Sequence, residues 1–108
     1  MINEAFQLIL NLRNDGILVN AVTYDTVIKF LCKYGLIDKA KELVRVMVSQ
    51  GVNPDFVTYT TLLTNASKNT SAEEIVELHD FMILEGVVPD EHTYKTIVLP
   101  LVDATTNL

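Results

Sequence analysis

The sequence predicts an all-α fold, an α-solenoid of stacked antiparallel helical hairpins, because an internal repeat and a helical apolar period coincide in it. The string Val22-Thr23-Tyr24 recurs as Val57-Thr58-Tyr59 and then as His92-Thr93-Tyr94, at a step of 35 residues. Residues 21–55 and 56–90 align without a gap and are identical at 12 of 35 positions. A fixed period of this length is typical of arrays in which each unit packs only on its neighbours.

The repeat divides a single domain, residues 1–108, into two complete units and two incomplete ones. Glycines keep the same step at Gly16, Gly51 and Gly86, and so do prolines at Pro54 and Pro89. The prolines close the linkers, since the residue before a proline is biased away from helix. We expect a half repeat at 1–20, repeats at 21–55 and 56–90, and a partial repeat at 91–108.

Each unit begins with an amphipathic helix, in which apolar residues recur at spacings of three and four. The apolar stripe is Tyr24, Val27, Ile28, Leu31 and Cys32, then Tyr59, Leu62, Leu63 and Ala66, then Tyr94, Ile97, Val98 and Leu101. We expect Pro100 to end or kink the last of these helices, because an interior proline loses a hydrogen bond and clashes with the preceding turn.

A second helix with the same period completes each unit. Its stripe is Ala40, Leu43, Val44 and Met47, matched by Ile75, Leu78, His79 and Met82, and near the N-terminus by Ala5, Leu8, Ile9 and Leu12. Gly35 suits a left-handed helix C-terminus, and Ser71 with Glu74 forms a capping-box pattern. The sequence therefore predicts six helices, and no strand pattern competes with them.

Composition and charge exclude several classes of protein. The chain has 108 residues, is 49% hydrophobic and carries a formal net charge of -6, which allows a packed core but argues against a generic basic nucleic-acid binder. The net charge does not exclude a protein that binds nucleic acid through local contacts. The single cysteine excludes a disulfide scaffold and a multi-cysteine zinc site, so we expect no metal and no cofactor. No apolar run approaches the roughly 20 residues of a membrane span, and no signal or transit peptide is visible.

The repeat resembles the pentatricopeptide repeat, whose length of 35 residues it shares. The resemblance is carried by Val22-Thr23-Tyr24-Asp25-Thr26-Val27-Ile28, Leu31-Cys32-Lys33, Asp38-Lys39-Ala40 and Gly51-Val52-Asn53-Pro54-Asp55. The tetratricopeptide repeat has a 34-residue period and a tryptophan-containing pattern that is absent here. The resemblance implies a protein that binds single-stranded RNA and reads one base per repeat with two or three side chains.

The resemblance implies that each base is chosen by the residue after the tyrosine and by the last residue of the repeat. These pairs are Asp25 with Asp55 and Thr60 with Asp90. The second pair implies guanine, whose ring N–H and amino group suit a hydroxyl and a carboxylate as acceptors. The first pair departs from the common combinations, and its preference stays open. Asn20 and Lys95 would read for the incomplete repeats.

Further residues of the first helices are implied to hold the RNA. Val22, Val57 and His92 would sandwich bases, while Lys33 and Lys68 would approach phosphate. The helical spacing by itself places these residues on one face of each first helix. The three stripes are Val22, Asp25, Lys29 and Lys33; Val57, Thr60, Thr64 and Lys68; and His92, Lys95 and Leu99. An apolar residue can pack on a base, a polar one can bond its edge, and a lysine can meet a phosphate.

Each of these residues also has a purely structural interpretation. The two aspartates at the ends of repeats stand where a helix N-cap is wanted. The two valines can pack on the neighbouring repeat, and the two lysines lie in a last helical turn, where a cation favours the dipole. His92 can be a plain surface residue, and His79 a packed helix residue.

Two functions from different classes follow. The first is a sequence-specific single-stranded RNA-binding module in organelle RNA processing, stability or translation, mitochondrial or alternatively in the chloroplast, as the resemblance implies. The second is a protein-interaction solenoid or a truncated, inactive repeat fragment, favoured by the acidic charge, by Asp25 and by the short length. A neutral or positive stripe on the first helices would favour RNA, and an acidic or apolar one a protein partner.

The chain shows no catalytic motif, neither a phosphate loop nor a nucleophile elbow nor a paired-histidine metal motif, so we expect that it is not an enzyme. The half repeats at both ends would leave an apolar face unpaired. We therefore expect further repeats or end-to-end self-association.

Overall fold

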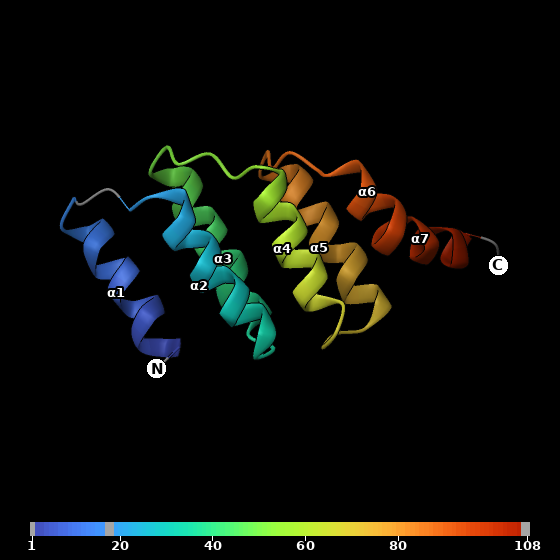
Figure 1. Ribbon diagram of the computed structural model, residues 1–108, viewed down its shortest axis with the longest axis horizontal. Coiled ribbons are helices and arrows are strands. Elements are labelled where there is room, and N and C mark those ends of the chain that lie inside the picture. The colour runs from blue at the N-terminus through green and yellow to red at the C-terminus, as the bar shows by residue number, and fades with distance from the viewer. Residues whose placement is uncertain (1, 17–18, 107–108) are drawn as a thin grey trace.

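A computed structural model of the chain describes residues 2–16 and 19–106, and in these ranges every regular element is helical (Figure 1). Five helices come first: α1 (Ile2–Asn14), α2 (Ala21–Lys33), α3 (Ile37–Ser49), α4 (Phe56–Ala66) and α5 (Ala72–Leu84). A sixth helical segment consists of α6 (Glu91–Thr93), the π-helical turn η1 (Tyr94–Val98) and α7 (Leu99–Thr106). The predicted all-α fold is confirmed.

The helices stack side by side into a short solenoid. α2 with α3 and α4 with α5 form antiparallel hairpins, with α1 at one end of the row and α7 at the other (Figure 1). α2 packs against both α3 and α4. The first helices of the repeats therefore lie next to one another, and the second helices form the other layer. The result is elongated, with extents of 50 × 25 × 18 Å.

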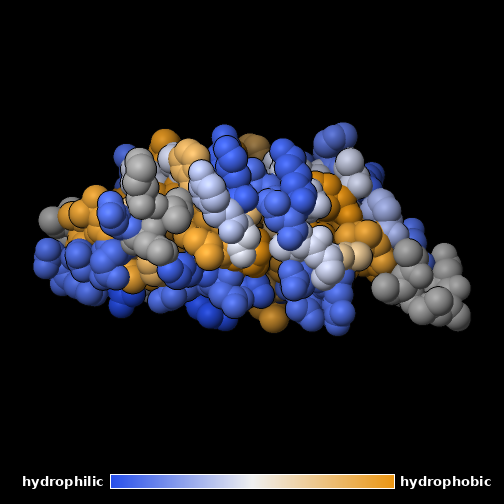
Figure 2. Space-filling view, turned by 90° about the horizontal axis from the view of Figure 1, so that it is seen from below, coloured by the Kyte–Doolittle hydropathy of each residue, from blue (hydrophilic) through white to orange (hydrophobic). Residues whose placement is uncertain are grey.

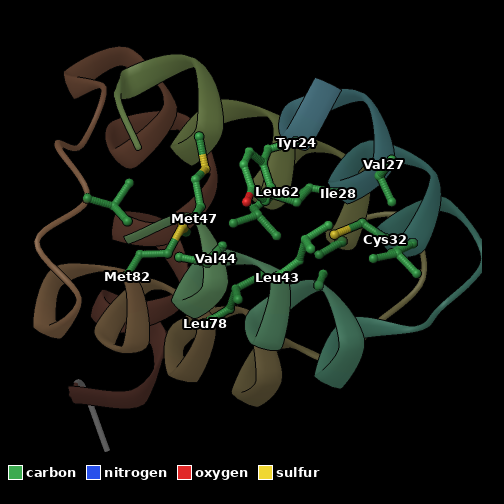
Figure 3. Packing of buried hydrophobic residues seen from close by; sticks show 14 of the residues in the cluster. Tyr24, Val27, Ile28, Cys32, Leu43, Val44, Met47, Leu62, Leu78 and Met82 are labelled. Carbon is green, nitrogen blue, oxygen red and sulfur yellow. The ribbon is translucent and has the colours of Figure 1, made fainter. Parts of the chain in front are cut away.

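The core runs through the repeats without interruption. Every residue of the predicted apolar stripes of α2 and α4 is buried, and so is every residue of the stripe predicted for α3. Figure 3 shows Tyr24 and Ile28 of α2 and Met47 of α3 in one cluster with Leu62 of α4 and Met82 of α5. Because side chains of adjacent hairpins share this cluster, apolar burial, the main favourable term in folding, holds one repeat against the next.

The N-terminal helix buries a narrower face than its period predicts. Leu8, expected on the buried stripe, is 57% exposed, whereas Phe6 and Ile9 are buried. α1 packs on α2, and the Lys39 ammonium of α3 lies 5.7 Å from the centre of the Phe6 ring. Within the described residues α1 has neighbours on one side only, so the stripe that includes Leu8 is only partly covered.

Glycines end the helices in the predicted left-handed conformation. Gly35 has φ +77° and Gly51 has φ +74°. In both turns the residue after the glycine donates its N–H to a carbonyl five residues earlier: Leu36 to Leu31 at 2.8 Å, and Val52 to Met47 at 3.0 Å. This Schellman motif satisfies carbonyls that the helix end would leave unpaired. The motif ends both helices of repeat 21–55, and it recurs one repeat later at Gly86, where the Val87 N–H donates to the Met82 carbonyl at 2.9 Å.

The last helical segment does not end at Pro100, because α7 continues to Thr106. The irregularity lies one turn earlier, where the Leu99 N–H donates to the Tyr94 carbonyl five residues before it. A proline has no N–H for the carbonyl four residues back, and its ring would clash with that carbonyl in a regular α-helix. The widened π turn accommodates the ring without breaking the helix.

Candidate functional site

The predicted stripes of the first helices lie at the surface. Val22 is 74% exposed and Val57 45% exposed, so neither is buried against a neighbouring repeat. Asp25 and Thr60, one turn further along their helices, are half-buried. Lys33 ends α2 and Lys68 follows α4, and both are exposed, as are Lys29 and Thr64 of the same stripes.

The last residue of each repeat caps the next first helix. The Oδ1 of Asn20 accepts a hydrogen bond from the Thr23 N–H at 2.9 Å. The Oδ1 of Asp55 accepts from the N–H groups of Val57 (2.9 Å) and Thr58 (3.3 Å). The Oδ2 of Asp90 accepts from the Thr93 N–H at 2.9 Å. The structural interpretation of these residues is therefore correct, and the cap also fixes where each side chain stands.

A hydrogen-bonded chain joins the two residues predicted to read one base, Thr60 and Asp90. We call Thr60, Thr93 and Asp90 the second junction, because α4 and α6 meet there. The Thr93 hydroxyl donates to the Oδ2 of Asp90 at 2.7 Å, and the hydroxyls of Thr60 and Thr93 lie 3.0 Å apart. Thr93 is buried, and its burial holds the three hydrogen-bonded side chains in one geometry.

The protons of the second junction can be assigned. The side-chain hydrogen bond from Thr93, with a backbone one from the same residue, lowers the pKa of Asp90 below its usual 3.8, so this carboxylate is ionised at neutral pH and only accepts. The single hydroxyl proton of Thr93 therefore points to Asp90. Thr60 must then donate its own proton to Thr93. What Thr60 and Asp90 offer to solvent is acceptors alone: hydroxyl lone pairs and the Oδ1 of the carboxylate.

The equivalent contacts are rearranged one repeat earlier, where Asp25 replaces the threonine. We call Asp25, Thr58 and Asp55 the first junction. Here the hydroxyl of the buried Thr58 donates to the Oδ1 of Asp25 at 2.8 Å, across the boundary between α2 and α4. The backbone N–H of the same threonine donates to Asp55. Thr58 thus binds both carboxylates, but its hydroxyl faces the opposite way from that of Thr93.

Burial raises the pKa of Asp25 above its usual 3.8, against the lowering effect of the Thr58 hydroxyl, and the Asp55 charge raises the pKa further. The Asp25 carboxylate therefore carries a desolvation penalty that a cation or a hydrogen-bond donor from a ligand would relieve. A half-buried carboxylate beside a second one is an unusual arrangement for a surface that serves packing alone.

The second junction opens into a shallow surface hollow of about 300 Å³. Its walls are Phe56, Val57, Thr60, Thr61 and Asp90. The hollow thus holds both predicted reading residues together with the exposed valine predicted to contact a base. A flat apolar group with polar edges could rest on Val57 and reach Thr60 and Asp90 with its edge.

The remaining candidates lie on the same layer but are less organised. Lys95 is exposed and forms an ion pair with Glu91, with 2.7 Å between its Nζ and the Oε1. His92 is exposed at the start of the sixth helical segment. The Lys95 ion pair stays within its own repeat, whereas the charge of His92 acts on Asp90 of the preceding repeat and helps to lower the pKa of that carboxyl group.

Sequence reasoning missed Thr58 and Thr93 as site residues. Both were visible only as part of the repeated Val-Thr-Tyr string, and both are buried polar side chains among apolar ones. A threonine that recurs at every first helix, next to the buried tyrosine, was the available signal. Its role could not be read from spacing, because each threonine bonds a residue 33 positions earlier in the chain.

The acidic charge of the chain is not spread over the first helices. α5 carries Glu73, Glu74, Glu77 and Asp80 and no lysine or arginine. In contrast, α2 carries Lys29 and Lys33 against Asp25, and α4 carries no charged residue. The layer that holds both junctions is therefore close to neutral in spite of the net charge of -6.

The PPR repeat family matches this chain twice, at residues 19–68 and 54–99. The chain belongs to the pentatricopeptide repeat (PPR) family. Members of this family are typically RNA-binding proteins rather than enzymes. The two matched segments contain both junctions and every described helix except α1 and the part of α7 after Leu99.

The fold is also similar to a solved one, the crystal structure of the pentatricopeptide repeat protein PPR10 from maize. The TM-score is 0.72 at 30% sequence identity, over 97% of this chain and 15% of that chain. No curated protein matches the chain.

Two kinds of site are absent from the residues that the structure describes. None of their helices is long and apolar enough to span a membrane. They contain no group of three or more histidine, cysteine, aspartate or glutamate side chains placed to hold a metal ion.

Proposed function

We propose that this PPR module binds single-stranded RNA and selects the bases that it binds, one base at each junction. The observation that carries the proposal is the recurrence of one arrangement at a 35-residue step. At both junctions a buried threonine links the residue after a tyrosine to the last residue of the same repeat. A network that is repeated, half-exposed and more polar than packing requires is suited to reading a repeated ligand.

The second junction is suited to guanine. Guanine presents two adjacent donors on its Watson–Crick edge, the ring N–H and the amino group. Thr60 and Asp90 present acceptors alone, because the Thr60 proton is used by Thr93. Guanine alone has two donors side by side on that edge: adenine and cytosine have one amino donor beside an accepting ring nitrogen, and uracil has one N–H between two carbonyls.

The surroundings of the junctions suit the rest of a nucleotide. Val57 offers an exposed apolar surface on which a base can pack, at the wall of the hollow that also contains Thr60 and Asp90. Lys33 and Lys68 lie at the far ends of the two stripes, where a phosphate of the same strand could reach them. The near-neutral charge of this layer favours RNA over the protein partner that an acidic or apolar stripe would have suggested.

The test is a titration of the whole chain, followed by amide NMR, with pentauridine and with the same RNA carrying one central guanosine. Two junctions bind weakly, and NMR measures weak affinities. We expect shifts on α2 and α4 and at the junction amides of Thr58 and Thr93, with little change on α3 and α5. A double-stranded RNA of the same length is the control. No shift with any single strand, or shifts confined to α3 and α5, would show that RNA reading is not the function.

We also propose that the module acts on organelle RNA, in processing, stability or translation, in mitochondria or alternatively in chloroplasts. The support is the family to which the chain belongs. Microscopy of the full-length natural protein, tagged at its C-terminus, tests the setting. Fluorescence inside either organelle is the expected result, and a signal confined to the cytosol or nucleus contradicts it.

A further inference from the structure

We propose that the first junction is a second guanine-selecting position, at which Asp25 and Asp55 accept only a base edge with two adjacent N–H donors. The inference rests on the proposed function, because it names the ligand of a junction that the proposed function leaves open. It concerns a pair of residues, two aspartates, whose chemistry differs from that of Thr60 and Asp90.

Each carboxylate of the first junction has one oxygen that is hydrogen-bonded within the protein. The Oδ1 of Asp25 is bound by the Thr58 hydroxyl, and the Oδ1 of Asp55 is bound by two backbone N–H groups. Among the described residues, nothing bonds the second oxygen of either carboxylate. The first junction therefore presents one unshared oxygen from α2 and one from the cap of α4, on either side of Thr58.

The hydrogen-bond donors of the first junction are all directed at its two carboxylates. The only proton of the Thr58 hydroxyl points to Asp25, and its N–H, like that of Val57, points to Asp55. Each polar hydrogen of the junction is therefore already used. A base that needs a donor from the protein would find none, which leaves the base itself to supply both hydrogen atoms.

The four bases differ in the donors that they carry on the Watson–Crick edge. Guanine has the ring N–H and the amino group side by side, and carboxylate oxygens bind such parallel N–H groups strongly. Uracil has one ring N–H between two carbonyl oxygens, and each of those would face a carboxylate. Adenine and cytosine have one amino donor beside a ring nitrogen that accepts. In each of these three bases an acceptor of the base would face a carboxylate oxygen, which also accepts. Guanine is therefore the base that fits.

The first junction selects between bases without relying on a hydroxyl hydrogen that can rotate, because the Thr58 hydroxyl donates to Asp25 and the reading side chain is a carboxylate. At the second junction Thr60 could in principle turn its hydroxyl toward a ligand if Thr93 released it. Asp25 carries no proton to turn while it is ionised. The first junction is therefore expected to reject other bases at least as strongly as the second, and to attract phosphate less because of its added negative charge.

The experiment uses the whole chain and two probes, pentauridine with one central guanosine and the same RNA with inosine in its place. Inosine keeps the ring N–H but lacks the amino group. Binding is followed at the Thr58 amide, which bonds Asp55, and at the Thr93 amide, which bonds Asp90. At the Thr58 amide we expect about tenfold weaker binding of the inosine RNA, and of pentauridine, than of the guanosine RNA.

Two substitutions of the same residue give the matched comparison. Asp25→Thr copies the residue found at the second junction and is expected to keep the guanosine preference. Asp25→Asn keeps the size and can still accept from Thr58, but its amide adds a donor. We expect it to reduce the guanosine preference at the Thr58 amide by about tenfold while the preference at Thr93 is unchanged. An amide spectrum of each free variant checks that the fold is retained.

The possible results separate this inference from the proposed function. Selective binding seen at Thr93 but equal response of Thr58 to all RNAs overturns the inference and leaves the proposed function standing. A preference at Thr58 for uridine over guanosine overturns it too, as does a guanosine preference that Asp25→Asn leaves intact. No RNA response at either amide overturns both.

Discussion

At the scale of single residues, the proposed function assigns stability and binding to different oxygen atoms of the last residue of a repeat. One oxygen of Asp55 accepts the first N–H groups of α4, and the other is free. Asp90 divides its two oxygens in the same way. The cap is therefore not an alternative to base reading. It is the reason that the reading oxygen stands at a defined place at the start of the helix.

The capping bonds of Asp55 predict how its substitution changes the stability of the chain. Asp55→Ala removes the cap and should lower the free energy of unfolding by about 1 kcal/mol. Asp55→Asn keeps an accepting oxygen and should change it by a few tenths at most. Urea denaturation followed by circular dichroism measures both. Equal losses in the two variants would show that the charge, and not the cap, is what stabilises α4.

His79 predicts how stability depends on pH. Burial lowers its pKa below 6.5, partly opposed by the Asp80 charge. Its Nδ1 lies 2.8 Å from the Tyr59 hydroxyl, and its ring packs against those of Tyr59 and Tyr94. A neutral imidazole can accept from that hydroxyl at Nδ1, and an imidazolium cannot.

The unfolded chain therefore binds a proton at His79 more readily than the folded chain. The free energy of unfolding should fall as the pH drops from about 7 through the ordinary histidine pKa, and level off below the folded pKa. His79→Val, which copies Val44 at the same place in the preceding repeat, should flatten that part of the profile. Thermal denaturation between pH 7 and 5 measures it, and an unchanged slope in the variant would assign the dependence to another group.

At the scale of elements, the turn between a second helix and the next repeat depends on a glycine. Gly51 has φ +74°, and a Cβ added there would meet no atom within 4 Å. Any destabilisation by a side chain at this position therefore comes from the left-handed backbone conformation and not from a steric clash. Gly51→Ala should destabilise the chain by about 1–2 kcal/mol, and Gly51→Asn by less, because asparagine tolerates this region. Chemical denaturation compares the two, and a Gly51→Ala variant as stable as the wild type would contradict the turn.

The elements also show how far the sequence predicts this structure. The repeat and its apolar period locate every helix of the two hairpins, and the left-handed Gly35 and the cap Ser71 stand where predicted. Leu8 was misplaced, because burial depends on which neighbours a helix has. The bonds of Thr58 and Thr93 were missed because each joins residues 33 positions apart in the sequence. The π turn before Pro100 is a local way to accommodate the proline ring, where the sequence predicted only an end or a kink of the helix.

At the scale of the whole molecule, the excess of acidic residues lies in the second layer of the solenoid. The acidic residues of α5 lie on the second layer, and the lysines of the junction stripes on the first. Figure 2, a view from below, shows hydrophobic surface toward the α1 end and near the C-terminal end, with hydrophilic surface along the edges between them. Contacts between repeats are local throughout, so a ligand that crosses junctions meets each in succession.

The lysines at the far ends of the stripes predict a modest salt dependence. If Lys33 and Lys68 each neutralise one phosphate, the logarithm of the binding constant should fall with the logarithm of salt with a slope of about -1.4. Lys33→Ala or Lys68→Ala should reduce that slope by about 0.7 and weaken all single-stranded RNAs alike. Titrations at three salt concentrations measure it. A slope near zero, or a loss confined to one RNA sequence, would show that these lysines do not contact phosphate.

The central claim is that bases are read at the junctions, and Thr60 tests it most directly. Thr60→Val removes the hydroxyl at nearly constant shape, and Thr64→Val makes the same change one turn further along the exposed stripe. The measurement is the affinity of the whole chain for pentauridine with one central guanosine, relative to pentauridine, at the Thr93 amide. We predict about tenfold preference in the wild type and in Thr64→Val, and none in Thr60→Val. An unchanged preference in Thr60→Val, or an equal loss in both variants, would contradict the claim.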